Sequence, residues 1–188
     1  KVIPIPTGVE NELLPSRNGH GMINNEIFDK LEYLKYNDVD SISNHNRVYA
    51  NFSTPSYGCH LYSSFPGYRS IVKHQCESSE FIDFESNIGI SEYFNKVIQY
   101  PASISPTGNG LECIRTWEIM YMNRIPIVIG LGNNSHSAIY ENIYKHLPLV
   151  FIEDVNTLSN KDYIFDQIEK SYTKPRSKLD YNYWKQFI

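Results

Sequence analysis

The sequence lacks the features that mark several common classes of protein. Its three cysteines are an odd number and form no CxxC pair, so neither a disulfide scaffold nor a structural zinc site is expected. No apolar run approaches the ~20 residues of a membrane span, and no secretory leader is visible. The 17 basic residues do not outnumber the 21 acidic ones, so the positive excess of a nucleic-acid-binding protein is missing. We therefore expect no membrane span and no nucleic-acid partner.

What is present is enough apolar material for a folded domain. The chain has 188 residues, of which 41% are hydrophobic and 14% aromatic. A chain of this length forms one domain, or at most two small ones, with a real core. The sparing use of cysteine favours a reducing compartment. We expect a cytoplasmic location, or a lumenal one if the chain is part of a longer enzyme of the secretory pathway.

Short apolar runs alternate with helical stretches along the chain. Residues 125–129 read Ile-Pro-Ile-Val-Ile, which is typical of a strand buried on both faces. Further strands are expected at residues 2–5, 47–53, 80–85, 102–105 and 149–152. Helices are expected at about 24–35, 69–75, 91–98, 111–123, 137–146 and 161–170, with Ser91 as a cap of the third and Thr157 or Ser159 as a cap of the last.

This alternation predicts an α/β fold. We expect a Rossmann-like, doubly wound and mostly parallel sheet of about six strands with helices on both faces. The domain should span residues 1–173, and an aromatic tail, residues 174–188, should be helical. Ligands of such sheets bind at the carboxyl ends of the strands, in the loops that lead to helices.

The segment 105–128 carries the clearest functional pattern. Gly108, Asn109 and Gly110 lie in a turn between a strand and a helix, where free N–H groups and the positive end of the helix dipole suit a phosphate. Arg115, in the first turns of that helix, can reach a diphosphate with charge-assisted bonds. Glu118 lies three residues later and could accept hydrogen bonds from the hydroxyls of a ribose. The alternative is that Arg115 and Glu118 form a surface ion pair and that the glycines serve only the turn.

The same segment, PTGNGLECIRTWEIMYMNRIPIV, resembles the C-terminal part of exostosin-like glycosyltransferases. Weaker matches to the family occur in the same order as in its members, over about residues 1 to 155. They are the PIPTGVEN segment that starts at Pro4, Asn51-Phe52-Ser53 with Arg69 downstream, and LPLV before Glu153-Asp154. Two positions depart from the family: Glu112 stands where Asp is common, and Ile114 stands where His is common.

The resemblance implies the nucleotide-sugar-binding domain of a GT-B glycosyltransferase, which moves a sugar from a UDP- or GDP-linked donor to a glycan acceptor. Arg115 and Arg69 would face the diphosphate, Glu118 would hold the ribose, and Gly108 to Gly110 would back the phosphates. No cofactor or metal is implied, because cationic side chains and a helix N-terminus neutralise the leaving diphosphate. A complete GT-B enzyme has two such domains, so the acceptor-binding domain would be another part of a longer protein or a separate chain.

Three other residues are candidates for the same site. Asn51 lies at the end of a predicted strand and could face the ligand. His20 and Arg17 lie in a glycine-containing loop after the first predicted strand, where either could contact phosphate and His20 could act as a base; an ordinary loop role is the alternative.

Other signals were weaker. Asp38-Val39-Asp40 matches a metal-binding DxD but follows a predicted helix, and we interpret it as a solvated turn. Trp117 and Met120 are interpreted as core residues, and Cys113 as a small packing residue. A non-catalytic nucleotide- or glycan-binding module of the same fold is the main alternative function. An unrelated nucleotide-binding enzyme such as an epimerase is disfavoured, because no GxGxxG follows the first strand.

Overall fold

The computed structural model describes residues 42–54, 67–107, 113–130, 141 and 143–179. The predicted strand at 2–5, the predicted helix at about 24–35 and the turn at 108–110 lie outside these residues. So do residues 137–140 and 142 of the predicted helix at 137–146.

Five parallel strands form one sheet in the described part of the chain. They are β1 (Val48–Asn51), β2 (Ile82–Glu85), β3 (Ala102–Ser105), β4 (Ile125–Ile129) and β5 (Val150–Ile152). The strands lie in the order β2-β1-β3-β4-β5, and each neighbouring pair is parallel. This Rossmann-like α/β arrangement confirms the predicted fold class.

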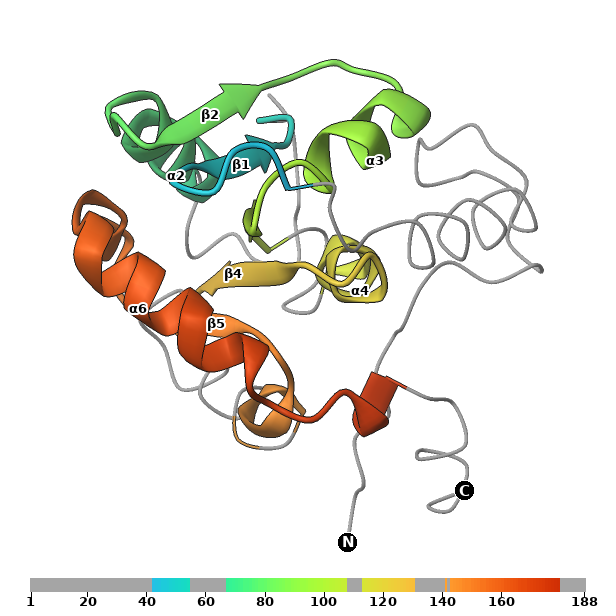
Figure 1. Cartoon of the computed structure of the whole chain (residues 1–188). Helices are drawn as coiled ribbons and strands as arrows, with labels where there is room; N and C mark the ends of the chain where they lie inside the picture. The colour runs from blue at the N-terminus through green and yellow to red at the C-terminus, as the bar shows by residue number, and fades with distance from the viewer. Residues whose placement is uncertain (1–41, 55–66, 108–112, 131–140, 142, 180–188) are drawn as a thin grey trace, which may run out of the picture.

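Helices cover both faces of the sheet. The α-helices are α2 (Tyr68–Glu77), α3 (Ile90–Val97), α4 (Ile114–Tyr121) and α6 (Lys161–Tyr172), and the 3₁₀ turns are η2 (Tyr144–His146), η3 (Val155–Ser159) and η4 (Ser177–Leu179). Figure 1 shows α2 and α6 on one side of the sheet and α3 and α4 on the other. No helix within the described residues is long and apolar enough to span a membrane.

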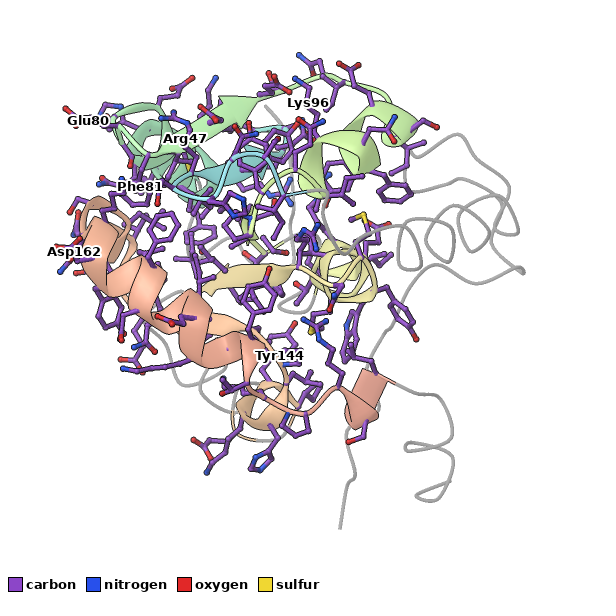
Figure 2. The ribbon with its side chains drawn as sticks, viewed as in Figure 1. Arg47, Glu80, Phe81, Lys96, Tyr144 and Asp162 are labelled. Atoms are coloured by element: carbon purple, nitrogen blue, oxygen red, sulfur yellow. The ribbon has the colours of Figure 1, made fainter. Side chains whose placement is uncertain are left out.

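Alternation along the strands explains why both faces are covered. In β1, Val48 and Ala50 enter the core beneath α2 and α6, whereas Tyr49 points to the layer of α3 and α4. The isoleucines of β4 join the first core and Val128 packs with Trp117 of α4, so this strand is buried on both faces as predicted. Figure 2 shows Phe81 near the N-terminal end of α6, where its ring contacts that of Phe165, with centroids 5.9 Å apart.

The predicted strands within the described residues are confirmed, but three predictions about helix starts are wrong. Gly89, not Ser91, is the N-cap of α3. Asn160 caps α6 by accepting a hydrogen bond from the Tyr163 backbone N–H, because Thr157 and Ser159 belong to the preceding turn η3. The helix predicted to begin at residue 111 begins at Ile114, since Cys113 keeps an extended backbone as its N-cap.

The described part of the C-terminal tail packs against α4. Arg176 donates a hydrogen bond from Nη1 to the carbonyl of Met120 (3.0 Å), and Tyr121 donates to the carbonyl of Leu179 (2.8 Å). Within the described residues of the tail, Ser177–Leu179 form the 3₁₀ turn η4. Residues 180–188 lie outside the described part of the chain, so the helical tail stays a prediction.

Candidate functional site at the carboxyl ends of β1 and β3

The sheet order identifies one crevice as the expected place for a ligand. From β1 the chain passes through α2 to β2 on one side, and from β2 it passes through α3 to β3 on the other side of β1. The direction of winding therefore reverses between β1 and β3. Doubly wound sheets bind their ligands outside the carboxyl ends of the strands at such a reversal.

Arg69 of α2 spans this point. Its Nε donates a hydrogen bond to the carbonyl of Thr107, just after β3, at 2.8 Å. Its Nη1 donates to the carbonyl of Ser53, just after β1, at 3.0 Å. The Arg69 guanidinium thus joins the segment that follows β1 to the segment that follows β3, the two strands between which the winding reverses.

Arg115 reaches the same point from α4. It is the second residue of the helix, and its Nη1 donates a hydrogen bond to the carbonyl of Asn51, the last residue of β1. The guanidinium lies over the ring of Tyr93 of α3, 4.8 Å from the centroid. Its Nε is buried and has no acceptor among the described residues. The structure therefore brings together the two arginines for which a diphosphate-binding role is predicted, and that role stays a prediction.

The N-terminus of α4 adds to the positive potential here. Cys113, its N-cap, is half-buried, and no described side chain accepts a hydrogen bond at this cap. The first N–H groups of a helix carry a partial positive charge that favours an anion. An anion beside Arg115 would therefore also lie next to the positive end of this helix.

The Asn51 side chain serves the sheet. Its Nδ2 donates a hydrogen bond to the carbonyl of Glu85 in β2 (3.2 Å), and the residue is 6% exposed. What Asn51 contributes to the crevice is its carbonyl oxygen, which holds Arg115.

Glu118 lies inside the molecule. It is 0% exposed, so the alternative of a surface ion pair with Arg115 is wrong. Its charge lies close enough to Tyr93 to contribute to the raised pKa of that phenol. The predicted contact with a ribose therefore requires a neighbouring group to move aside.

Tyr93 is the site residue that the sequence did not reveal. It is 2% exposed, and burial raises its pKa well above the ordinary value, against the opposing effect of Arg115. The sequence predicted only that Tyr93 lies in a helix, at residues 91–98. Its contact with Arg115 depends on how α3 and α4 pack, and no local pattern encodes that packing.

The remaining predicted site residues belong to segments outside the described part of the chain. Arg17, His20, Gly108, Asn109 and Gly110 lie outside the described residues, as does the Asp38-Val39-Asp40 segment. Trp117 and Met120 are core residues as predicted, with exposed fractions of 2% and 1%.

A buried pair of hydroxyls fixes α4, and with it Arg115, to the sheet. Ser105 Oγ at the end of β3 lies 2.9 Å from Thr116 Oγ1, the next residue after Arg115. Both residues are 1% exposed. This hydrogen bond sets the position of the first turn of α4 relative to the strand end.

An ion-pair network holds the edge strand β2 beside the site. Asp83 accepts hydrogen bonds from Arg47 and Tyr100, and Glu85 accepts from Lys96 and Tyr49. The Arg47 guanidinium is the main cause that lowers the pKa of Asp83, and the Lys96 ammonium is the main cause that lowers the pKa of Glu85. Burial, helped by the bond to Glu85, raises the pKa of Tyr49 above its ordinary range.

At the same carboxyl end of the sheet, the region beside β5 is acidic. A cavity of about 490 Å³ lies at the carboxyl end of β5, and its lining includes Glu141, Glu153 and Asp154. These carboxylates would repel a phosphate there, which favours the crevice between β1 and β3 as the place for an anion. Within the described residues, no group of three or more His, Cys, Asp or Glu side chains could hold a metal ion.

The sequence matches no protein-family model, and no curated protein matches it. The likeness to exostosin-like glycosyltransferases therefore rests on the motifs themselves.

Proposed function

We propose that this chain is the donor-binding domain of a glycosyltransferase that uses a nucleotide diphosphate sugar. One observation carries the proposal: Arg69 and Arg115, from two different helices, both donate hydrogen bonds to backbone carbonyls at the carboxyl end of β1, and Arg69 also donates to one just after β3, where the winding of the sheet reverses. The resemblance of the segment from Pro106 to Val128 to exostosin-like enzymes supports the same assignment.

The chemistry of the crevice suits a diphosphate. Each guanidinium carries a full positive charge and donates to backbone carbonyls at the strand ends, so both charges are held at this point. Guanidinium groups bind phosphate oxygens with short, charge-assisted and often bidentate hydrogen bonds. Two of them beside a helix N-terminus would stabilise the negative charge that develops on a departing nucleoside diphosphate. On this proposal the donor is UDP- or GDP-linked, the acceptor is a glycan, and the transfer needs no metal.

Calorimetric titration of the purified chain with UDP, GDP and inorganic pyrophosphate tests the proposal. We expect one of the nucleotides to bind without added metal. Arg115→Ala and Arg69→Ala should each raise its dissociation constant at least about tenfold, which corresponds to ~1.4 kcal/mol. Lys170→Ala is the matched control, since it removes an exposed positive charge on α6 whose ion-pair partner is Asp166. Unchanged affinity in both arginine variants, or an equal loss in the control, would refute the site.

Glu118→Gln separates the ribose role from the phosphate role. If Glu118 accepts hydrogen bonds from ribose hydroxyls, the substitution weakens binding of the nucleotide and leaves binding of pyrophosphate unchanged. Arg115→Ala should weaken both. A Glu118→Gln variant that binds nucleotide as tightly as the wild type would show that the buried carboxylate has a structural role only.

A further inference from the structure

Tyr93 occupies the centre of the layer between the sheet and helices α3 and α4. It lies one turn before Val97, on the face of α3 that packs against the sheet. Its ring contacts those of Tyr49 and Phe94, with centroids 6.5 and 5.5 Å away. Packing on these sides gives the ring a single position.

This fixed ring forms one wall for the guanidinium of Arg115. The guanidinium carbon lies 4.8 Å from the ring centroid, within the range of a cation–π interaction. The Asn51 carbonyl accepts a hydrogen bond from Nη1 of the same group. Arg115 is thus held by a ring from α3 and a carbonyl from β1, two elements other than its own helix.

The hydroxyl group of Tyr93 plays no part in this arrangement. Its Oη is buried and has no hydrogen-bond partner among the described residues. The contact with Arg115 is made by the ring face. The ring and the hydroxyl can therefore be tested separately by substitution.

We infer that Tyr93 is a positioning residue for Arg115, and this inference rests on the proposed function. The ring holds the guanidinium at the end of β1 before any ligand arrives. A free arginine side chain has many rotamers, and fixing it on binding costs free energy. A guanidinium already held in place contacts a diphosphate without that cost, so Tyr93 raises nucleotide affinity although it touches no ligand.

Substitutions that keep or remove the ring test this role. Tyr93→Phe keeps the ring and should leave the dissociation constant for the bound nucleotide, UDP or GDP, within about twofold of the wild type. Tyr93→Leu removes the ring and should raise that constant about fivefold, the size of a cation–π contact of ~1 kcal/mol. If the leucine variant does not fold, Tyr93→Met serves in its place, because methionine fills the volume without a ring.

Met122→Ala is the matched control. Met122 is the C-cap of α4 and is fully buried in the same cluster, but it lies at the opposite end of α4 from Arg115 and is not one of the rings that fix Tyr93. Its truncation loosens the same core and should leave nucleotide affinity unchanged. An equal loss of affinity in Met122→Ala and Tyr93→Leu would refute positioning by Tyr93, because general loosening of the core would explain both.

The double variant with Arg115→Ala separates this inference from the proposed function. If Tyr93 acts through Arg115, Tyr93→Leu has no further effect on affinity once Arg115 is alanine. A further fivefold loss in the double variant would overturn the role of Tyr93, while the loss in Arg115→Ala alone would still support the proposed function. Wild-type affinity in Arg115→Ala together with a loss in Arg69→Ala would overturn the role of Tyr93 alone, whereas no nucleotide binding by the wild type would overturn both.

Discussion

The hydrogen bond between Ser105 and Thr116 offers a quantitative test of how α4 is attached to the sheet. Thr116→Val replaces the hydroxyl by a methyl group of nearly the same shape, so packing is kept while the bond is lost. Ser105 Oγ then stays buried without its partner, because Ser105 is 1% exposed. The reverse substitution, Ser105→Ala, leaves the Thr116 hydroxyl in the same condition.

The expected magnitudes follow from this burial. Leaving one hydroxyl buried and unsatisfied costs ~1–3 kcal/mol, whereas removing both partners of a buried hydrogen bond can be nearly neutral. We therefore expect each single variant to lose about 1.5 kcal/mol and the double variant no more than about 1 kcal/mol. In a chain of this length, 1 kcal/mol lowers the melting temperature by roughly 2–4 °C.

Urea unfolding of the wild type, both single variants and the double variant measures this coupling. Thr173→Val is the control, because it removes a threonine hydroxyl whose hydrogen bond, to the backbone carbonyl of Lys170, lies at an exposed position. Its loss should cost less than about 0.5 kcal/mol. A double variant that loses the sum of the two single losses would refute the reasoning, since the two hydroxyls would then act independently.

Two further predictions concern the rest of the sheet. Folding lowers the pKa values of Asp83 and Glu85 from 3.8 and 4.5, so the stability that these carboxylates contribute is present above pH 4.5 and is lost as the pH falls through their folded pKa values. Urea unfolding from pH 7 to pH 3 should therefore show a smaller loss of unfolding free energy at low pH in Asp83→Asn than in the wild type, and identical profiles would contradict this. Gly130→Ala should destabilise the fold by ~1–3 kcal/mol, because the new Cβ would lie 3.1 Å from Phe151 Cζ and 3.3 Å from Glu153 Cα; Gly89→Ala, whose Cβ would meet nothing within 4 Å, should cost clearly less in the same thermal melt.

The strands were predictable because each carries its own signal. An apolar run of five residues at Ile125–Ile129 has no exposed side, and the structure pairs it with a strand on each flank. Helix starts were less predictable, since several polar residues compete for each cap. Asn160, rather than Thr157 or Ser159, is the N-cap of α6 because its side chain accepts a hydrogen bond from the Tyr163 N–H. This position of the cap depends on the 3₁₀ turn η3 before it.

The candidate site was predictable in part. Arg69 and Arg115 are 46 positions apart, and only the resemblance to a known family linked them before the structure brought them to one strand end. The burial of Glu118 was not predictable, because helical spacing places it near Arg115 without saying which face of α4 meets the core. The Asn51 amide bonds to the Glu85 carbonyl because β1 and β2 pair in a register that places these two residues opposite each other. The sequence of either strand alone does not contain this register.

The arginines at this site have a role in the fold itself, apart from the ligand proposed for them. At the carboxyl ends of parallel strands, backbone carbonyl groups no longer have a neighbouring strand to donate hydrogen bonds to them. A buried carbonyl without a donor costs free energy. Here side chains of α2 and α4 supply the donors: Arg69 for Ser53 and Thr107, Arg115 for Asn51, and the Tyr68 hydroxyl for Ile129 at the end of β4.

The two kinds of donor differ in charge. A tyrosine satisfies a carbonyl and adds no charge. A guanidinium satisfies it and also leaves a positive charge at the carboxyl end of the sheet. The two arginines lie where the winding reverses, so on the proposed function the groups that complete these backbone hydrogen bonds also favour an anion at that point rather than at the acidic end of β5.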